Sequence, residues 1–189
     1  MRAATIVDDH VAAGERMRGW FGRTAVLASM AASLMIAGTQ ARAESRVLIA
    51  GGLGAFDFLH NYTAGEGRLE LRFAESFFYL KPSVGTFFTT KGSVYTYFAL
   101  RGEIPLGSHF MIVPIAAVGD YEKGSGKDLG AHVEFKTGAE FDFVFNNGLR
   151  VGPAFDHVSN AGIGKRNPGE ENLLLMVTVP FGLIAGAGK

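Results

Sequence analysis

The sequence predicts an all-β fold, an eight-stranded antiparallel up-and-down transmembrane β-barrel. Helical periodicity is nearly absent after residue 44, and apolar and polar residues alternate with period two in runs of strand length. The number of runs is even, which permits closure by hairpins alone. The eight predicted strands span roughly 45–58, 66–75, 79–90, 93–104, 109–121, 131–145, 148–158 and 170–181.

The first predicted element is a cleavable signal peptide, residues 1–43. Two arginines precede an apolar run, and the sequence at 41–43 fits a small-x-small cleavage site. The apolar run, 24–37, is shorter than the ~20 residues that a spanning helix needs, which disfavours the alternative of a membrane anchor. Acidic residues before Met17 do not suit a signal peptide, so Met17 is a candidate translation start.

The remaining chain, residues 44–189, has the length of one domain. It carries 13 Lys and Arg against 15 Asp and Glu, so it lacks the basic excess that attracts nucleic acid. Cysteine is absent, so the exported chain contains neither a disulfide nor a cysteine-linked lipid anchor. These features exclude a nucleic-acid partner and leave a barrel domain with no covalent crosslink.

The segment 131–145 shows the alternation most clearly. Its odd positions are mostly apolar and include Phe141 and Phe143, whereas its even positions include Glu134 and Lys136. A soluble barrel would bury the apolar face, and a membrane barrel would turn that face to lipid. Strand lengths near the ~9 to 11 residues of a tilted span favour the membrane barrel. Charges of both signs, which could pair in a narrow lumen, favour it too.

The predicted connections differ in length between the two rims. Residues 146–148, Asn-Asn-Gly, form a tight hairpin signal, and the connection at 105–108 is also short. The connections at 59–65, 122–130 and 159–169 are longer. Short turns on one rim and long loops on the other are typical of outer-membrane barrels.

Polar residues interrupt the apolar face where the last two predicted strands meet. His157 and Ser159 share the apolar parity of 148–159, and Glu171 shares the apolar parity of its own strand. Side chains at i and i+2 on a strand lie ~6 to 7 Å apart, within reach of an imidazole and a hydroxyl. A neighbouring carboxylate would fix the other ring nitrogen, and Asn160 or nearby amides could bind an oxyanion.

Each of these residues also has an ordinary interpretation. A histidine at a barrel rim can simply reach the head-group zone, Ser159-Asn160 is common loop chemistry, and Glu170-Glu171 can be a solvated strand start. The conjunction is more informative, because unpaired polar groups are costly on a lipid-facing surface. His60, His109 and His132 have no neighbouring nucleophile, and no metal-ligand spacing or phosphate-binding loop stands out, so no metal or cofactor is expected.

A set of residues within 157–171 carries a family resemblance. The residues are His157-Val158-Ser159-Asn160-Ala161-Gly162, followed by Asn167, Gly169 and Glu171. This set resembles the signature of the lipid A 3-O-deacylases, the PagL family, and the barrel-like pattern accompanies it over the whole of 44–189.

The resemblance implies an outer-membrane enzyme that hydrolyses the ester-linked acyl chain at position 3 of lipid A. It implies Ser159 as the nucleophile, His157 as the general base and acid, and Glu171 as the residue that orients His157. Asn160 is the implied oxyanion donor and Asn167 a supporting residue.

With a periplasmic amino end, odd strands run outward, so the site is expected at the depth of the outer leaflet.

Three points stay open in the sequence: the third member of the triad, the class of function and the oligomeric state. A one-residue bulge could make Glu170 rather than Glu171 the third member of the triad. The alternatives are a non-enzymatic small barrel in adhesion or envelope structure, a phospholipase A-like esterase and a soluble ligand carrier. The sequence is compatible with a monomer or a homodimer.

Overall fold

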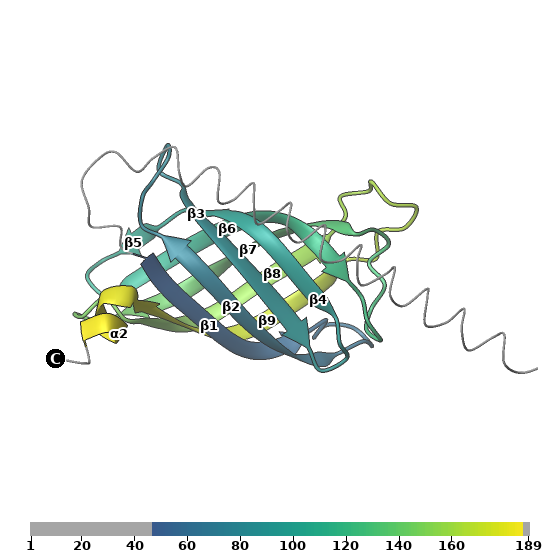
Figure 1. Ribbon diagram of the computed structural model, residues 1–189, viewed down its shortest axis with the longest axis horizontal. Helices are drawn as coiled ribbons and strands as arrows, with labels where there is room; N and C mark the ends of the chain where they lie inside the picture. The colour runs from purple at the N-terminus through teal and green to yellow at the C-terminus, as the bar shows by residue number, and fades with distance from the viewer. Residues whose placement is uncertain (1–46, 187–189) are drawn as a thin grey trace, which may run out of the picture. The chain divides into compact units, whose positions relative to one another are not determined.

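The computed structural model describes residues 47–186, and these form a closed antiparallel β-barrel followed by one short helix (Figure 1). The predicted signal peptide, 1–43, and the candidate start at Met17 lie outside the described residues. Among the described residues, no helix is long and apolar enough to cross a bilayer.

The strands make up most of the described chain. They are β1 (Val47–Phe56), β2 (Ala64–Phe73), β3 (Lys81–Thr89), β4 (Val94–Arg101), β5 (Ile104–Leu106), β6 (Phe110–Glu122), β7 (Val133–Val144), β8 (Arg150–Ser159) and β9 (Glu170–Pro180). The helix α2 (Phe181–Gly186) follows β9 directly.

Apart from β4 and β5, which both pair with β6, each strand pairs with its neighbours in the sequence, and the barrel closes where β1 pairs with β9. β4 and β5 together form the one strand predicted at 93–104. Both pair with β6 in the same register, since Arg101 lies opposite Ile115 and Ile104 lies opposite Ile112. The interruption falls opposite Pro114, which has no N–H to donate to the ladder. The prediction of an eight-stranded antiparallel barrel is therefore confirmed.

The apolar face of the wall points outward, as the sequence predicted. Along β7, Phe135, Phe141 and Phe143 are exposed, whereas Glu134 and Lys136, at positions of the opposite parity, are buried in the lumen. The same inversion holds around the barrel, where leucines and phenylalanines cover the outside. A soluble barrel would place these side chains the other way round.

Ion pairs fill the lumen. The Arg72 guanidinium is completely buried and binds Glu70 and Glu140, with a further hydrogen bond of 3.0 Å from Nη1 to the Thr178 hydroxyl. Arg68 binds two other carboxylates in the same way. Buried charges are tolerated when they are paired and hydrogen-bonded, and removing one partner of such a pair costs about 3–5 kcal/mol.

Aromatic side chains close the lumen near one end. Phe56 and Phe87 are fully buried with ring centroids 5.9 Å apart, and Tyr95 and Tyr121 pack with them. The Tyr121 hydroxyl donates to the Lys127 carbonyl oxygen at 2.8 Å. The aromatic cluster thus supports the loops above it.

The two ends of the barrel differ. The long-loop end carries the connections 57–63, 90–93, 123–132 and 160–169, and the short-turn end carries 74–80, 107–109 and 145–149.

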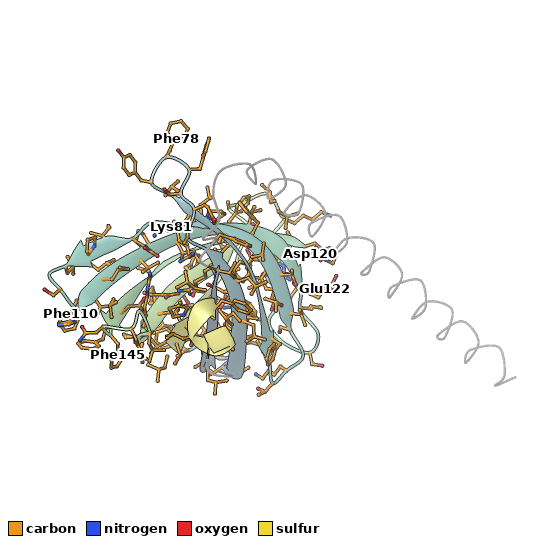
Figure 2. The ribbon with its side chains drawn as sticks, turned by 60° about the vertical axis from the view of Figure 1, so that its left-hand side comes forward. Phe78, Lys81, Phe110, Asp120, Glu122 and Phe145 are labelled. Atoms are coloured by element: carbon orange, nitrogen blue, oxygen red, sulfur yellow. The ribbon has the colours of Figure 1, made fainter. Side chains whose placement is uncertain are left out.

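One connection at the short-turn end departs from prediction. β2 ends two residues before the expected place and β3 begins two residues after it, because 74–80 forms a projecting turn. Phe78 and Tyr79 at its tip have φ values of 48° and 67°, a region that bulky side chains rarely adopt. Figure 2 shows Phe78 standing away from the wall.

Candidate functional site

The candidate site lies on the outer wall at the long-loop end, where β8 ends and β9 begins. His157 and Glu171 are directly opposite each other in the β8–β9 register, so their side chains project from the same face. His157 Nδ1 lies 3.1 Å from Glu171 Oε1, and the two side chains are 42% and 19% exposed. Because Nδ1 faces a carboxylate oxygen, it carries the proton and leaves Nε2 as the acceptor nitrogen.

Ser159 is the last residue of β8 and projects from the same face as His157, two residues further on. Within residues 47–186, no hydrogen bond joins the Ser159 hydroxyl to the His157 ring. The structure thus brings His157 and Glu171 into contact, and it places Ser159 beside them at the i, i+2 spacing of a strand. The catalytic roles of the three residues stay predictions.

Glu170 points the opposite way from Glu171. It is completely buried in the lumen, where Asn172 Nδ2 donates to its Oε1 at 2.9 Å. The register is unbroken, since Val158 pairs with Glu170 in the rung next to that of His157. Because β9 contains no bulge at its start, Glu171 is the carboxylate that reaches the histidine.

Gly169 fixes the position of the His157 ring. Its φ is +60°, and a Cβ atom placed there would lie 2.6 Å from His157 Cε1. Any larger residue would displace the imidazole, and its backbone would be strained. The glycine that precedes β9 therefore lets the ring approach the main chain closely.

Asn160 organises the loop 160–169. The side chain is completely buried, and Nδ2 donates to the carbonyl oxygens of Leu129 at 2.8 Å and Arg166 at 2.7 Å. Both amide hydrogens are thus committed, and the Asn160 backbone N–H donates to Asn167 Oδ1 at 3.0 Å. In this conformation Asn160 has no N–H free for an oxyanion, so its predicted role in the oxyanion hole requires a rearrangement of the loop. Asn167 supports the loop by accepting that N–H.

The neighbouring loop 123–132 is tied to the same structure. Asp128 lies 3.2 Å from the Arg166 guanidinium, and the Gly130 N–H donates to the Asp128 carboxylate at 3.0 Å. This N–H lowers the pKa of Asp128, and Lys123 and Arg166 lower it further. The two loops therefore hold each other beside the end of β8.

Large apolar side chains surround the polar site on the outer wall. Phe155 and Leu173 lie opposite each other two rungs from His157 and Glu171, on the same face, and both are exposed. Phe58 meets Phe155 edge to face at 6.1 Å, and Phe135 lies opposite Ser159 on β7. The outer wall next to the polar site is therefore apolar.

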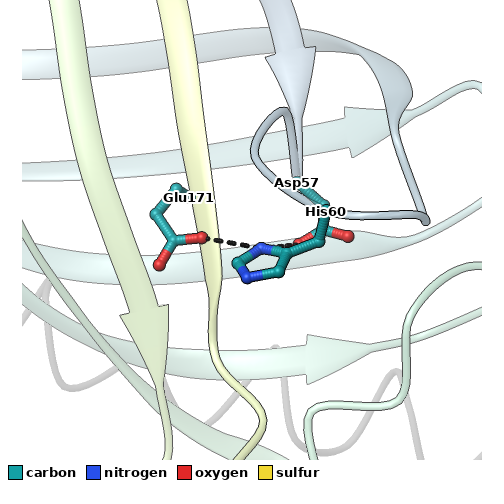
Figure 3. A group of neighbouring side chains, drawn as sticks. All are labelled: Asp57, His60 and Glu171. Atoms are coloured by element: carbon teal, nitrogen blue, oxygen red, sulfur yellow. Dashed lines mark ion pairs between the residues drawn. The ribbon is translucent and has the colours of Figure 1, made fainter.

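The sequence reasoning missed His60, which also contacts the site. His60 Nδ1 lies 3.1 Å from Glu171 Oε2 and 3.3 Å from Asp57 Oδ1. Figure 3 shows the His60 ring between the two carboxylates. Local sequence carries no sign of this contact, because His60 lies far from Glu171 along the chain. The predicted closure of the barrel could have indicated this contact, since it places β1 beside β9 and therefore the first loop beside Glu171.

Asp57, His60 and Glu171 also present oxygen and nitrogen atoms within 4.8 Å of one another, a spacing compatible with metal ligands. Asp57 Oδ1, however, already lies 2.6 Å from Lys127 Nζ. An ammonium group on the same oxygen would repel a cation, so these contacts fit an ion-pair cluster better than a metal site.

These features define a class of protein: a small lipid-facing β-barrel with a histidine–carboxylate pair and an adjacent serine on its outer wall. A family model described as lipid A 3-O-deacylase (PagL) matches residues 51–180. The chain belongs to this family.

Solved structures resemble the barrel. The crystal structure of the outer membrane enzyme PagL matches with a TM-score of 0.54 and 20% identity, covering 70% of this chain and 99% of that one. Neisserial surface protein A matches at 0.44 and 13% identity, covering 71% and 96%. The outer membrane protein Ail of Yersinia pestis matches at 0.46 and 9% identity, covering 72% and 99%. No curated protein matches the chain.

Proposed function

We propose that this protein is an outer-membrane lipid A 3-O-deacylase that uses Ser159, His157 and Glu171. The observation that carries the proposal is the His157–Glu171 pair on the lipid-facing wall, two residues from a serine, in a chain of this family. A hydrolytic site on the outside of the barrel suits a substrate that diffuses within the membrane. No step of the reaction requires a cofactor.

The reaction begins when His157 Nε2 takes the proton of the Ser159 hydroxyl as its oxygen attacks the ester carbonyl carbon. Glu171 holds Nδ1–H and stabilises the imidazolium that forms. The tetrahedral intermediate then expels the sugar oxygen, which receives the proton from Nε2. Water, deprotonated by the same nitrogen, attacks the acyl-serine and releases the fatty acid.

The negatively charged oxygen of the intermediate needs an N–H donor. Asn160 is occupied in loop contacts, whereas the Ala161 N–H has no acceptor among residues 47–186. Ala161 also has a φ of 53°, which sets its backbone apart from the strand that precedes it. We propose the Ala161 N–H as an oxyanion donor, with Asn160 and Asn167 holding the loop in shape.

The decisive test is Ser159→Ala in the full-length chain, expressed in the outer membrane of a Gram-negative host. We expect loss of 3-O-deacylated lipid A by mass spectrometry, with a fall in kcat of at least about 10³-fold. Ser125→Ala, which removes a hydroxyl from another loop at the same end, is the matched control and should stay active.

Other outcomes separate the alternatives. Undiminished removal of the acyl chain by a correctly inserted Ser159→Ala variant would contradict the proposed nucleophile. Release of fatty acid from phospholipid, with lipid A unchanged, would indicate a phospholipase. A wild-type barrel that inserts and leaves both lipids intact would indicate a structural or adhesive role.

A further inference from the structure

We infer that His60, in the first loop, is a positioning residue that holds the second oxygen of Glu171. It would thus be a fourth residue that supports the triad of the proposed reaction. The inference rests on the proposed function. Glu171 Oε1 contacts His157 and Oε2 contacts His60, each at 3.1 Å. The carboxylate is thereby held between two imidazole rings, one from β8 and one from the loop 57–63.

The loop 57–63 is fixed around Asp57, which is completely buried and has a φ of 52°. Its carboxylate accepts from the Tyr62 N–H at 3.1 Å and contacts Lys127 Nζ at 2.6 Å. The Thr63 hydroxyl is within 3.1 Å of the Asp57 carbonyl oxygen and 3.0 Å of that of His60. The loop is therefore a rigid turn rather than a free tether for His60.

The same loop is joined to β9 through the main chain. The Phe58 N–H donates to the Glu171 carbonyl oxygen at 3.1 Å. Phe56, the residue before the turn, lies in the aromatic cluster inside the barrel. The main-chain hydrogen bond on one side of Asp57 and the packing of Phe56 on the other thus hold the loop, and with it His60, beside Glu171.

The chemistry follows from the geometry of a carboxylate. Its side chain can rotate about its terminal bond, and a contact to only one oxygen leaves that rotation free. His60 Nδ1 lies within ion-pair distance of Asp57 Oδ1 and Glu171 Oε2, but neither contact has the geometry of a hydrogen bond in this structure. A protonated His60 ring attracts both carboxylates. Holding Oε2 keeps Oε1 aimed at His157 as the imidazolium forms. Such orientation affects the chemical step more than substrate binding, because misplacement of supporting groups lowers turnover.

The experiment measures kcat and KM on purified lipid A in detergent micelles for the full-length chain and its variants. We expect His60→Ala to lower kcat by about 10- to 100-fold and leave KM within about twofold. His60→Asn should recover most of the loss, because its amide nitrogen stands near the position of Nδ1. His132→Ala is the matched control, since His132 is an exposed histidine at the same end that pairs with Glu122 instead.

A double-mutant cycle distinguishes positioning from a purely structural role. If His60 acts through Glu171, then His60→Ala has little further effect on kcat in a Glu171→Gln background. An equal effect in both backgrounds, or no rescue by His60→Asn, would overturn the inference. Loss of wild-type activity with a chelator, restored by a divalent cation, would also overturn it, because the cluster would then be a metal site.

Failure of the proposed function would look different. Ser159→Ala in the same assay reports whether the triad cleaves lipid A at all. If wild type and Ser159→Ala are equally active, the proposed function fails, and the inference fails with it. If Ser159→Ala is inactive while His60→Ala matches wild type, only the inference fails.

Discussion

The outer wall and the lumen of this barrel use the same residue types for opposite purposes, and Glu170 and Glu171 show the contrast. Glu170 faces inward, fully buried, within a network that includes Asn172 and Asp156. Glu171 faces outward among apolar side chains and contacts two histidines. Glu170 accepts one hydrogen bond, from Asn172, inside the lumen, whereas Glu171 contacts two histidines from separate segments on the lipid-facing wall. Burial, then, does not by itself mark a functional carboxylate here.

The largest effect is expected when the same substitution is made on the two faces. Glu171→Gln should lower kcat by about 10⁴-fold, because an amide no longer fixes the tautomer of His157 or stabilises its charge. Glu170→Gln should keep kcat within about threefold, because its side chain does not reach the outer wall. Steady-state kinetics on lipid A measure both. A reversed order would mean that β9 shifts by one residue during catalysis.

The lumen is expected to govern stability instead of activity. Arg72→Ala removes the partner of two buried carboxylates, which should lower the free energy of unfolding by about 3–5 kcal/mol. Leu71→Ala, one residue away on the outer wall, should cost roughly 1 kcal/mol or less, because its side chain is half exposed to lipid. Urea unfolding in detergent measures both changes. The folded fraction of Arg72→Ala should keep the wild-type kcat. A lower kcat in that fraction would show that the lumen ion pairs also affect the site on the outer wall.

Gly169→Ala should have a smaller effect, confined to the wall. A methyl group there meets the His157 ring, so we expect kcat to fall by about 10- to 100-fold. Gly162→Ala is the control, because Gly162 also has a positive φ, of 82°, but no atom lies within 4 Å of the added Cβ. Equal losses in the two variants would assign the effect to backbone strain in the loop.

The smallest effect is expected from the pair between the two loops. Asp128→Asn removes the contact with Arg166, and exposed pairs of this kind contribute little. The pKa of Asp128 is lowered in the folded protein, so the pair persists above the ordinary range of a carboxyl group and is lost only as pH falls through the lowered value. Activity at neutral pH should stay within about twofold of wild type. A larger loss would show that the contact between the two loops shapes the site.

Much of the fold was predictable because a strand has a period of two. The alternation in 131–145 predicts which residues face lipid, and the parity of His157 and Glu171 places both outside. The interruption between β4 and β5 was not predictable from that segment, because its cause is Pro114 on the neighbouring strand. A connection was predicted at 76–78, but its extent, 74–80, was not, because its aromatic residues are typical of strands.

The sequence by itself determined the number of strands, the face that meets lipid, and the side of the wall on which His157, Ser159 and Glu171 stand, since all three depend on local alternation. Only the tertiary structure decided that β9 starts without a bulge, that the Asn160 amide is used within its loop, and that His60 reaches Glu171. Those facts depend on register and on barrel closure, which bring together residues from distant parts of the chain.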